Sequence, residues 1–452
     1  MDKKIVLAIG IMAFLSLISL TVVSAQTTVT NVSTWPMFHA GVTTGTGPAT
    51  NELAWNYTTN GAMWSSPAVA DGMLFTGSYD HQIYALNALT GKLVWNYTTG
   101  DAIDSSPAVS SGIVYVGSND HNLYALNETN GILIWNYTTG SQVQSSPVIM
   151  NGIVYVGSND HNLYAFNAVT GASLWNFTTG NNVISTPAVA NGAVYFGSYD
   201  HKVYALDAVT GSQLWNFTTD SVIESSPAIA NNVLYIGSYD NNTYALNAST
   251  GAKVWSVNTG YDLCVQASPV VDNGIVYTGG SYNGYIYAYN ATDGSTVWSY
   301  NATPTAPPGP ISIETSTGIY SAPAVAGNLV FVTAFNNTYA LDATTGKLAW
   351  IFQTNGVLYS SPAVANGMVY VDSYDHNIYA IGSSTPASTP IPTPVFTPTS
   401  TPMSTFTPAP TPAPTISPGA LTNYTVYIVV VVVIIVVVAI AAGIALSKRR
   451  HK

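Results

Sequence analysis

A unit of about 40 residues recurs along most of the chain, and it is clearest as SSPAVSSGIVYVGSNDHNLYALNETNGILIWNYTTG over residues 105–140. Within it, short runs of β-branched and aromatic residues are separated by Ser-Gly, Asn-Asp-His and Asn-Gly turn residues. This spacing predicts four antiparallel strands per unit. A single such sheet, with no helix to cover it, cannot bury its apolar faces in water. The sheets must therefore stack against one another.

The number of copies predicts the architecture. The first-strand proline occurs eight times, at Pro67, Pro107, Pro147, Pro187, Pro227, Pro269, Pro323 and Pro362. The fourth-strand tryptophan also occurs eight times, but it starts before the first copy at Trp55 and ends at Trp350. The last sheet therefore lacks its outer strand, while residues 52–58 (ELAWNYT) form a spare one. Joining the two predicts an all-β fold, an eight-bladed β-propeller of four-stranded antiparallel blades closed by the N-terminal strand.

The same residues carry a family resemblance. The pattern SxPAVxxGxVYVGSxDxxxYALxAxTGxxxW resembles the repeat of the pyrroloquinoline-quinone-type (PQQ-like) propellers, and WPMFHAG from Trp35 resembles the segment that often precedes it. The resemblance covers about residues 35–382. It implies either of two functions, because the family includes quinoprotein dehydrogenases and non-enzymatic relatives such as the lipoprotein propeller of the bacterial outer-membrane assembly machinery. The repeat specifies a fold, and a fold alone does not specify an activity.

The residues that the dehydrogenases of this family need for catalysis are missing. Those enzymes resemble this chain in their repeats, but they place an adjacent cysteine pair beside the cofactor and a calcium ion, held by acidic and amide residues, next to a catalytic aspartate. This chain has one cysteine, Cys264, and no inserted loop with the matching acidic motif. It also has no nucleophile elbow, zinc helix or phosphate loop. We therefore expect no catalytic residue, metal or cofactor; the alternative is a dehydrogenase-like protein that binds PQQ with calcium on the ring axis.

Charge excludes one class of partner. Only 7% of the residues are charged, and the formal net charge is -11 with 10 Lys and Arg. Binding to nucleic acid needs a basic stripe, which so few cations spread along the chain cannot form. We expect no nucleic-acid partner.

The composition divides the chain into six segments. Residues 1–25 have the basic start, apolar run and small-residue end of a signal peptide, and 26–50 are a polar extension expected to lie over one face of the ring. The propeller covers 51–382, and 383–422 form a disordered stalk rich in Pro and Thr. A transmembrane helix is expected over 423–446, followed by the basic cytoplasmic tail 447–452. This layout predicts a single-pass protein of the cell membrane with an extracellular propeller, and it resembles archaeal cell-surface proteins.

The loops divide between the two faces of the ring. In a four-stranded blade that begins at the axis, the second turn and the link to the next blade emerge on one face, and the first and third turns on the other. Both insertions, GYDLCVQAS and NATPTAPPGPISIETSTGIYS, fall in links. Insertions confined to one face often mark a binding face.

An Asp-His pair occupies the second turn of five blades. The pairs are Asp80-His81, Asp120-His121, Asp160-His161, Asp200-His201 and Asp375-His376. A ring of metal ligands or a proton relay is one interpretation. Equivalent turns of neighbouring blades should lie roughly 10 Å or more apart, too far for a shared metal shell. We favour a hairpin turn in which the aspartate accepts hydrogen bonds from its own backbone.

One position varies strongly in an otherwise uniform repeat. Three residues before each first-strand proline, the eight copies carry Trp64, Asp104, Gln144, Ile184, Glu224, Gln266, Tyr320 and Tyr359. These side chains should ring the mouth of a central funnel on the face that bears the insertions. Acids, amides and aromatics on a rigid scaffold favour a site for a saccharide, a peptide or another envelope protein. The alternative is variation without function at a solvent-lined position.

The outer strands carry two further patterns. A tryptophan in every blade indicates packing between blades rather than a ligand platform. Asn-x-Ser/Thr sequons are also frequent, and the candidates for glycosylation on the outer strands are Asn56, Asn96, Asn136, Asn176, Asn216 and Asn301. Glycans on this rim would keep a surface with few charges soluble.

These observations favour a non-catalytic binding or envelope-scaffold protein held outside the cell. The quinoprotein alternative and a purely structural envelope protein without a specific ligand stay open. Near-identical blades leave little room for a specialised catalytic site.

Overall fold

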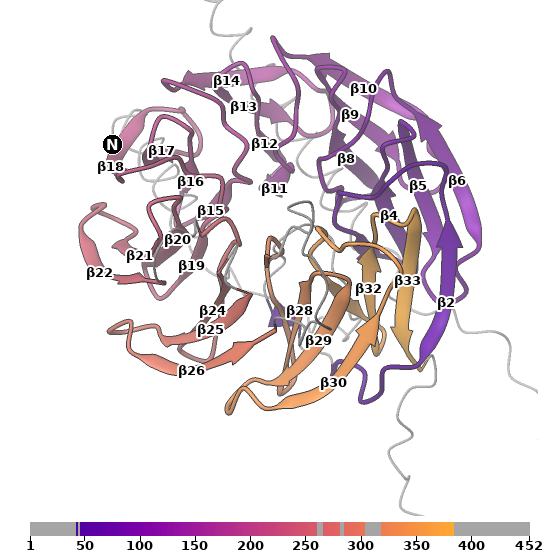
Figure 1. Ribbon diagram of the computed structural model, residues 1–452. Helices are drawn as coiled ribbons and strands as arrows, with labels where there is room; N and C mark the ends of the chain where they lie inside the picture. Colours follow the sequence, from indigo (N-terminus) through magenta and orange to yellow (C-terminus); the bar gives the residue numbers. More distant parts are fainter. Residues whose placement is uncertain (1–41, 44–45, 260–264, 281–283, 303–317, 384–452) are drawn as a thin grey trace, which may run out of the picture. The chain divides into compact units, whose positions relative to one another are not determined.

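The computed structural model describes residues 42–43, 46–259, 265–280, 284–302 and 318–383. In these ranges the chain forms eight sheets arranged around a central axis, which confirms the predicted eight-bladed propeller (Figure 1). The predicted signal peptide, transmembrane helix and basic tail, nearly all of the stalk, and Cys264 lie outside the described residues. Within the described ranges, no helix is both long enough and apolar enough to cross a membrane.

Each blade is an antiparallel meander with its first strand at the axis. Blades 1 to 4 comprise β3 (Ala68–Ala70), β4 (Met73–Gly77), β5 (Gln82–Asn87) and β6 (Leu93–Thr98); β7 (Ala108–Ser110), β8 (Ile113–Gly117), β9 (Asn122–Asn127) and β10 (Leu133–Thr138); β11 (Val148–Met150), β12 (Ile153–Gly157), β13 (Asn162–Asn167) and β14 (Ser173–Thr178); β15 (Ala188–Ala190), β16 (Ala193–Gly197), β17 (Lys202–Asp207) and β18 (Gln213–Thr218). Blades 5 to 7 comprise β19 (Ala228–Ala230), β20 (Val233–Gly237), β21 (Asn242–Asn247) and β22 (Lys253–Asn258); β23 (Val270–Asp272), β24 (Ile275–Gly279), β25 (Tyr285–Asn290) and β26 (Thr296–Asn301); β27 (Ala324–Ala326), β28 (Leu329–Ala334), β29 (Asn337–Asp342) and β30 (Leu348–Gln353). Blade 8 comprises β31 (Ala363–Ala365), β32 (Met368–Asp372), β33 (Asn377–Gly382) and, as its outer strand, β2 (Leu53–Thr58).

The outer-strand tryptophans join neighbouring blades, as predicted. Trp95 of blade 1 is buried, and its indole Nε1 donates to the backbone oxygen of Glu128 in the third turn of blade 2 at 2.7 Å. The indole also packs on Gly131, where an added Cβ would lie 2.6 Å from the ring. The same donation recurs from Trp135 to Ala168 and from Trp215 to Ala248. The hydrophobic core therefore lies between the blades, and each blade stabilises the next.

The N-terminal strand closes the ring. β2 pairs antiparallel with β33, with Tyr57 opposite Ile378. Blade 8 has no third turn of its own, and the indole of Trp350 in blade 7 donates instead to the backbone oxygen of Pro48 at 3.1 Å. The segment before β2 thus supplies both the missing strand and the missing docking acceptor.

One strand was not predicted. β1 (Val42–Thr43) pairs in parallel with β27, the innermost strand of blade 7, so this sheet has five strands. Part of the N-terminal extension therefore lies on the axis side of the ring, rather than wholly over one face. Parallel pairing needs no alternating sequence pattern over only two residues, which is why the sequence did not indicate it.

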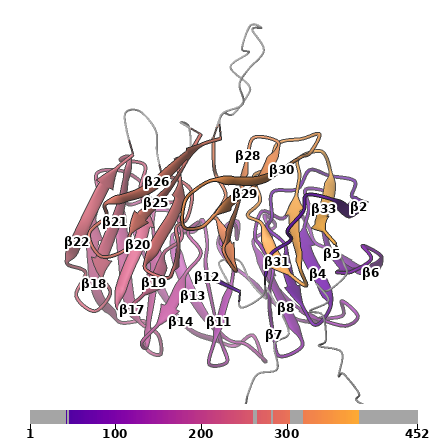
Figure 2. The same ribbon diagram turned by 90° about the horizontal axis from the view of Figure 1, so that it is seen from below.

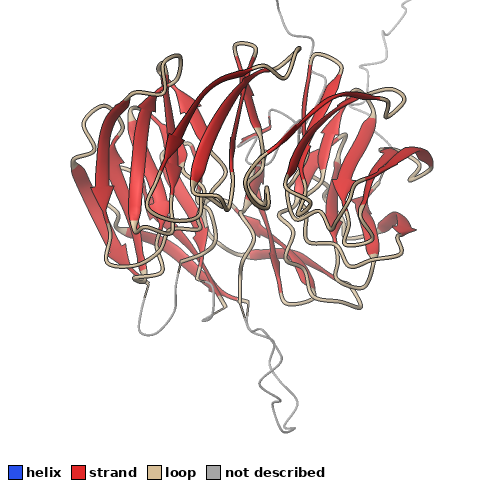
Figure 3. Cartoon of the chain, turned by 90° about the horizontal axis from the view of Figure 1, so that it is seen from above, coloured by secondary structure: helices blue, strands red, loops and turns tan. Residues whose placement is uncertain are grey.

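The turns and links of the described residues divide between two faces of the ring (Figures 2 and 3), and most of both predicted insertions, residues 260–264 and 303–317, lies outside the described residues. The second turn and the link lie together, because the backbone nitrogen of Thr99 donates to the oxygen of His81 at 2.8 Å. The first and third turns also lie together, since Ala88 donates to Gly72 at 2.9 Å. We call the face with the second turns and the links the link face, and the face with the first and third turns the opposite face.

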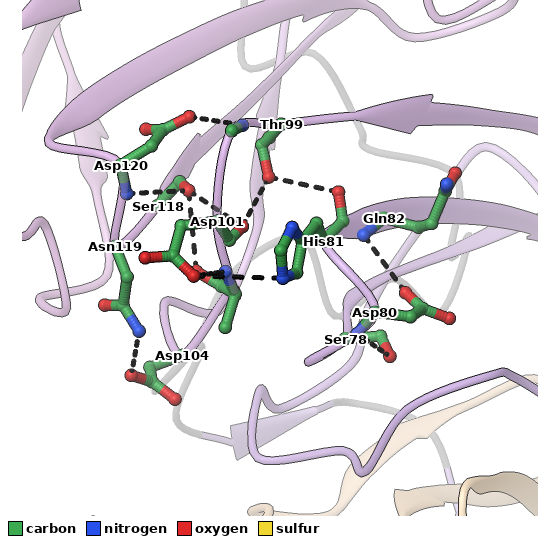
Figure 4. A network of polar contacts seen from close by, with 12 residues as sticks. Ser78, Asp80, His81, Gln82, Thr99, Asp101, Asp104, Ser118, Asn119 and Asp120 are labelled. Carbon is green, nitrogen blue, oxygen red and sulfur yellow. Dashed lines mark hydrogen bonds and ion pairs between the residues drawn. The ribbon is translucent and has the colours of Figure 1, made fainter.

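The Asp-His pairs are hairpin turns. In blade 2, one carboxylate oxygen of Asp120 accepts from the backbone nitrogen of Asn122 at 2.9 Å. Figure 4 shows the equivalent bond of blade 1, from the backbone nitrogen of Gln82 to Asp80. The other accepts from the backbone nitrogen of Gly100 in the incoming link and from the hydroxyl of Tyr124, both at 2.6 Å. His121 takes a positive φ of 74°. Among the described residues, no three His, Cys, Asp or Glu side chains are placed to share a metal ion.

Candidate functional site

All eight residues of the variable position surround one cavity on the axis. Its volume is about 120 Å³, and it opens at the level where the links enter the inner strands. Trp64, Asp104, Gln144, Ile184, Glu224, Gln266, Tyr320 and Tyr359 all line it. The repeat explains this convergence, because equivalent residues of eight blades lie at one height around one axis. We call this group the funnel ring.

A second ring, of buried hydroxyls, lies one step deeper along the inner strands. In this ring the backbone nitrogen of every residue except Ser268 donates to the hydroxyl of its counterpart in the next blade. Examples are the bonds from Ser66 to Ser106 and from Ser106 to Ser146, both at 2.9 Å. The members are Ser66, Ser106, Ser146, Thr186, Ser226, Ser268 and Ser361. Ala322 occupies the eighth position and has no hydroxyl to accept from Ser268. These bonds hold the inner strands in register and give the cavity a rigid polar floor.

Aromatic side chains form one wall of the cavity, on blades 7, 8 and 1. Trp64 stacks on Tyr359 with ring centroids 4.1 Å apart and planes 5° apart, and Tyr359 also contacts Tyr320 at 5.5 Å. Tyr79 lies parallel to Trp64 at 6.3 Å, and Tyr374 meets it edge-on at 6.4 Å. Trp64 is nonetheless 38% exposed, so this stack presents an apolar surface at the mouth.

Asp104 of blade 2 sits in a set of polar partners. Its carboxylate Oδ2 accepts from Nδ2 of Asn119 at 2.9 Å (Figure 4) and from Nε2 of Gln144, also at 2.9 Å. Burial, then the nearby charge of Asp104 and a hydrogen bond to that carboxylate, raise the pKa of Tyr79 far above its usual value. The other oxygen, Oδ1, is buried and has no hydrogen-bond partner among the described residues.

Glu224 of blade 5 is held more completely. Its Oε2 accepts from the hydroxyls of Tyr199 at 2.7 Å and Tyr239 at 2.5 Å. Its Oε1 accepts from Nε2 of Gln266 at 2.7 Å. Three donors from three blades thus fix one carboxylate at the edge of the cavity.

The partners of the funnel ring come largely from a position that the sequence analysis did not identify. They stand directly before the second-turn aspartate that six of the eight blades share, at Tyr79, Asn119, Asn159, Tyr199, Tyr239 and Tyr374. This position alternates between Tyr and Asn while its neighbours stay constant, which was a detectable signal. Because these side chains reach across to the funnel ring, the two variable positions form one unit. The acids of the ring therefore have dedicated donors, which is not expected of unconstrained drift.

The cavity carries negative charge that nothing nearby neutralises. The lining includes two carboxylates and no Lys, Arg or His. In the part of the chain that the structure describes, the lysine and arginine residues are Lys92, Lys202, Lys253 and Lys347. The single ion pair there, between Nε2 of His81 and Oδ1 of Asp101 at 3.8 Å, is half exposed and outside the cavity (Figure 4).

This lining does not fit the cofactor that the resemblance implies. Pyrroloquinoline quinone is a flat tricarboxylate, and the two acids of the funnel ring would repel it. The face of Trp64 that could stack on a planar cofactor already stacks on Tyr359. Cys264 lies outside the described residues.

The candidate glycosylation sites all face solvent. Asn56, Asn96, Asn136, Asn176, Asn216 and Asn301 are exposed on outer strands. Alternation along the strand explains this, because the tryptophan of each Trp-Asn-Tyr/Phe-Thr motif points inward and its asparagine outward. In blade 1, Nδ2 of Asn96 donates to Oε1 of Gln82 at 2.8 Å.

Comparisons with known proteins give the family and the fold. The profile of a family described as outer membrane protein assembly factor BamB matches residues 39–103, 98–186, 170–338 and 282–385. Among solved structures, BamB from Moraxella catarrhalis is similar with a TM-score of 0.61 and 18% identity, covering 74% of this chain and 100% of that one. A quinohemoprotein alcohol dehydrogenase from Comamonas testosteroni gives 0.63 and 15%, covering 78% and 81%. A europium-containing methanol dehydrogenase gives 0.60 and 14%, covering 71% and 84%. No curated protein sequence matches the chain significantly.

Proposed function

Because the chain belongs to the family described as outer membrane protein assembly factor BamB, we propose that it is a non-catalytic binding or scaffold protein. Its binding site is the cavity on the link face. The observation that carries this proposal is the pairing of the two variable positions: Asp104 and Glu224 each accept hydrogen bonds from their own blade and from a neighbouring blade. A fixed arrangement of polar and aromatic groups on a rigid ring is suited to recognition. The lining has no nucleophile activated by an adjacent base.

The location that we propose is the outer side of the cell membrane. A signal peptide over 1–25, a Pro/Thr stalk and a C-terminal apolar helix followed by SKRRHK support a propeller presented outside the cell. The ligand classes are an envelope protein, a peptide or a saccharide. Labelling intact cells with a membrane-impermeant amine reagent tests the location. The propeller lysines should react without cell lysis, and reaction only after lysis would contradict it.

The similar dehydrogenase structures give the alternative a specific test. We would measure the melting temperature of the full-length protein with pyrroloquinoline quinone and calcium, and separately with envelope saccharides and peptides. A ligand that binds the native state raises the melting temperature. Stabilisation by a saccharide or a peptide that is lost in Trp64→Ala would support the proposal. Calcium-dependent stabilisation by the quinone, followed by oxidation of an alcohol, would overturn it.

A further inference from the structure

We infer that the axial cavity takes a single basic side chain, a lysine or an arginine, from a partner protein. This inference rests on the proposed function, because it names the ligand of the same site. It depends on three properties of the cavity: its size, its charge and its aromatic wall.

Size restricts the occupant. A volume of about 120 Å³ is well below the 300–1,000 Å³ of typical small-molecule sites. The cavity cannot deepen to admit a larger ligand, because hydrogen bonds of the hydroxyl ring, such as that from Ser106 to Ser146, hold the inner strands together at its floor. One extended side chain fits such a space better than a planar cofactor or an oligosaccharide, which would have to lie across the mouth.

Charge selects a cation. Asp104 and Glu224 approach the axis from blades 2 and 5, and no cation lines the cavity. Their bonds to Asn119, Gln144 and the two tyrosines hold both carboxylates in place, so they cannot turn away to solvent. An ammonium or guanidinium group on the axis would interact favourably with both acids, and a like charge would be rejected.

The aromatic wall accommodates the rest of the side chain. The stems of lysine and arginine are apolar and pack along hydrophobic surfaces while the charged head remains in a polar environment. Trp64 and Tyr359 offer such a surface on blades 8 and 1, and Tyr320 extends it. A cation near the edge of this stack also gains from the electron-rich ring faces that stay exposed. Stem and head thus meet complementary walls of the same cavity.

The test uses the full-length protein in detergent and three blocked pentapeptides. Each is Gly-Gly-X-Gly-Gly, with X as lysine, Nε-acetyl-lysine or norleucine, titrated by ligand-observed NMR at low salt. The lysine peptide should bind, and the two uncharged peptides should bind about tenfold more weakly or not at all. Binding should also weaken as the salt concentration rises.

Isosteric variants identify the site. Asp104→Asn and Glu224→Gln should each weaken binding of the lysine peptide by about tenfold while keeping the far-UV circular dichroism and the melting temperature. Asp101→Asn is the matched control, because it removes one negative charge from the same face outside the cavity. Equal binding of the three peptides, or equal losses in all three variants, would overturn the inference. Displacement of the lysine peptide by micromolar calcium would also overturn it, since the site would then be a metal site.

Failure of this inference can be told from failure of the proposed function. A photo-crosslinking residue at Ile184 captures whatever occupies the cavity in living cells, whatever its charge. An adduct there without lysine-peptide binding would reject the basic side chain but keep the binding site. Absence of both would reject the two together.

Discussion

At the residue scale, Asp372 is an exception within the repeat. Six blades have glycine at this position in the second strand, as at Gly117, and blade 7 has Thr333. An added Cβ at Gly117 would lie 2.3 Å from the backbone oxygen of Val143. Asp372 is fully buried, accepts a hydrogen bond from the hydroxyl of Thr76 in blade 1, and leaves Oδ1 without a partner among the described residues. Burial raises the pKa of its carboxyl to about 8.

This carboxyl should make stability depend on pH. Its folded pKa of about 8 exceeds the usual unfolded value of 3.8, so its contribution is complete below about pH 4 and is lost as the pH rises through 8. Between those limits the free energy of unfolding should fall by up to about 1.4 kcal/mol per pH unit. Asp372→Asn should remove this slope. Urea unfolding at pH 5, 6, 7 and 8 measures it, and equal slopes in both proteins would contradict the assignment.

The funnel ring shows what the sequence could and could not predict about single residues. Comparison between blades was enough to find its eight members, because a variable position stands out against near-identical repeats. Their partners Asn119 and Tyr199 were missed, since a residue next to a recurrent turn aspartate is easily interpreted as part of the turn. Asp372 was missed because its neighbours follow the repeat, and only the structure shows that the position is closed to solvent.

At the element scale, closure depends on the pairing of β2 with β33. The repeat count predicts this pairing, because the series of eight tryptophans begins before the first proline and ends before the last one. One outer strand is therefore left over at the N-terminus, and one is missing at the C-terminus. The acceptor role of Pro48 and the strand β1 could not be predicted. Both belong to the segment before the first repeat, so no other blade offers an equivalent residue for comparison. The ring is therefore closed by an ordinary antiparallel strand pair whose two strands come from opposite ends of the propeller.

A pair of disulfides tests the closure. Thr58→Cys with Asn377→Cys links β2 to β33 across a separation of 319 residues, where the two side chains now share a hydrogen bond of 2.6 Å. Thr138→Cys with Asn122→Cys is the matched control inside blade 2, with the same bond across 16 residues. In a Cys264→Ala background both should form, and the first should stabilise more, by about 2.7 kcal/mol in the chain-entropy model. Melting temperatures of oxidised and reduced proteins measure the difference; a cross-link only in the control would argue against closure by β2.

At the scale of the whole molecule, the outer rim and the link face have separate roles. Exposed sequon asparagines on the outer strands point away from the axis, and the cavity lies at the centre. Glycans at the rim would leave the link face open. We expect the protein made in its native host to migrate well above the mass of its polypeptide and to shift on deglycosylation.

Glutamine substitutions refine this prediction. Changing Asn96, Asn136, Asn176 and Asn216 to Gln should lower the apparent mass in steps, while binding at the cavity stays within twofold, because the rim lies outside the cavity. A protein with no shift after deglycosylation and none after substitution would contradict the proposed glycoprotein surface.

The most direct test of the central claim is photo-crosslinking in living cells from the two faces of the ring. Ile184 lines the cavity without a hydrogen bond to lose, and Val169, in the third turn of blade 3, is 68% exposed on the opposite face. With a small aliphatic diazirine amino acid, close to isoleucine in size, at each position, we predict a discrete adduct from Ile184 and none from Val169. The absence of an adduct at Ile184, or the same adduct from both positions, would contradict a binding site on the axis of the propeller.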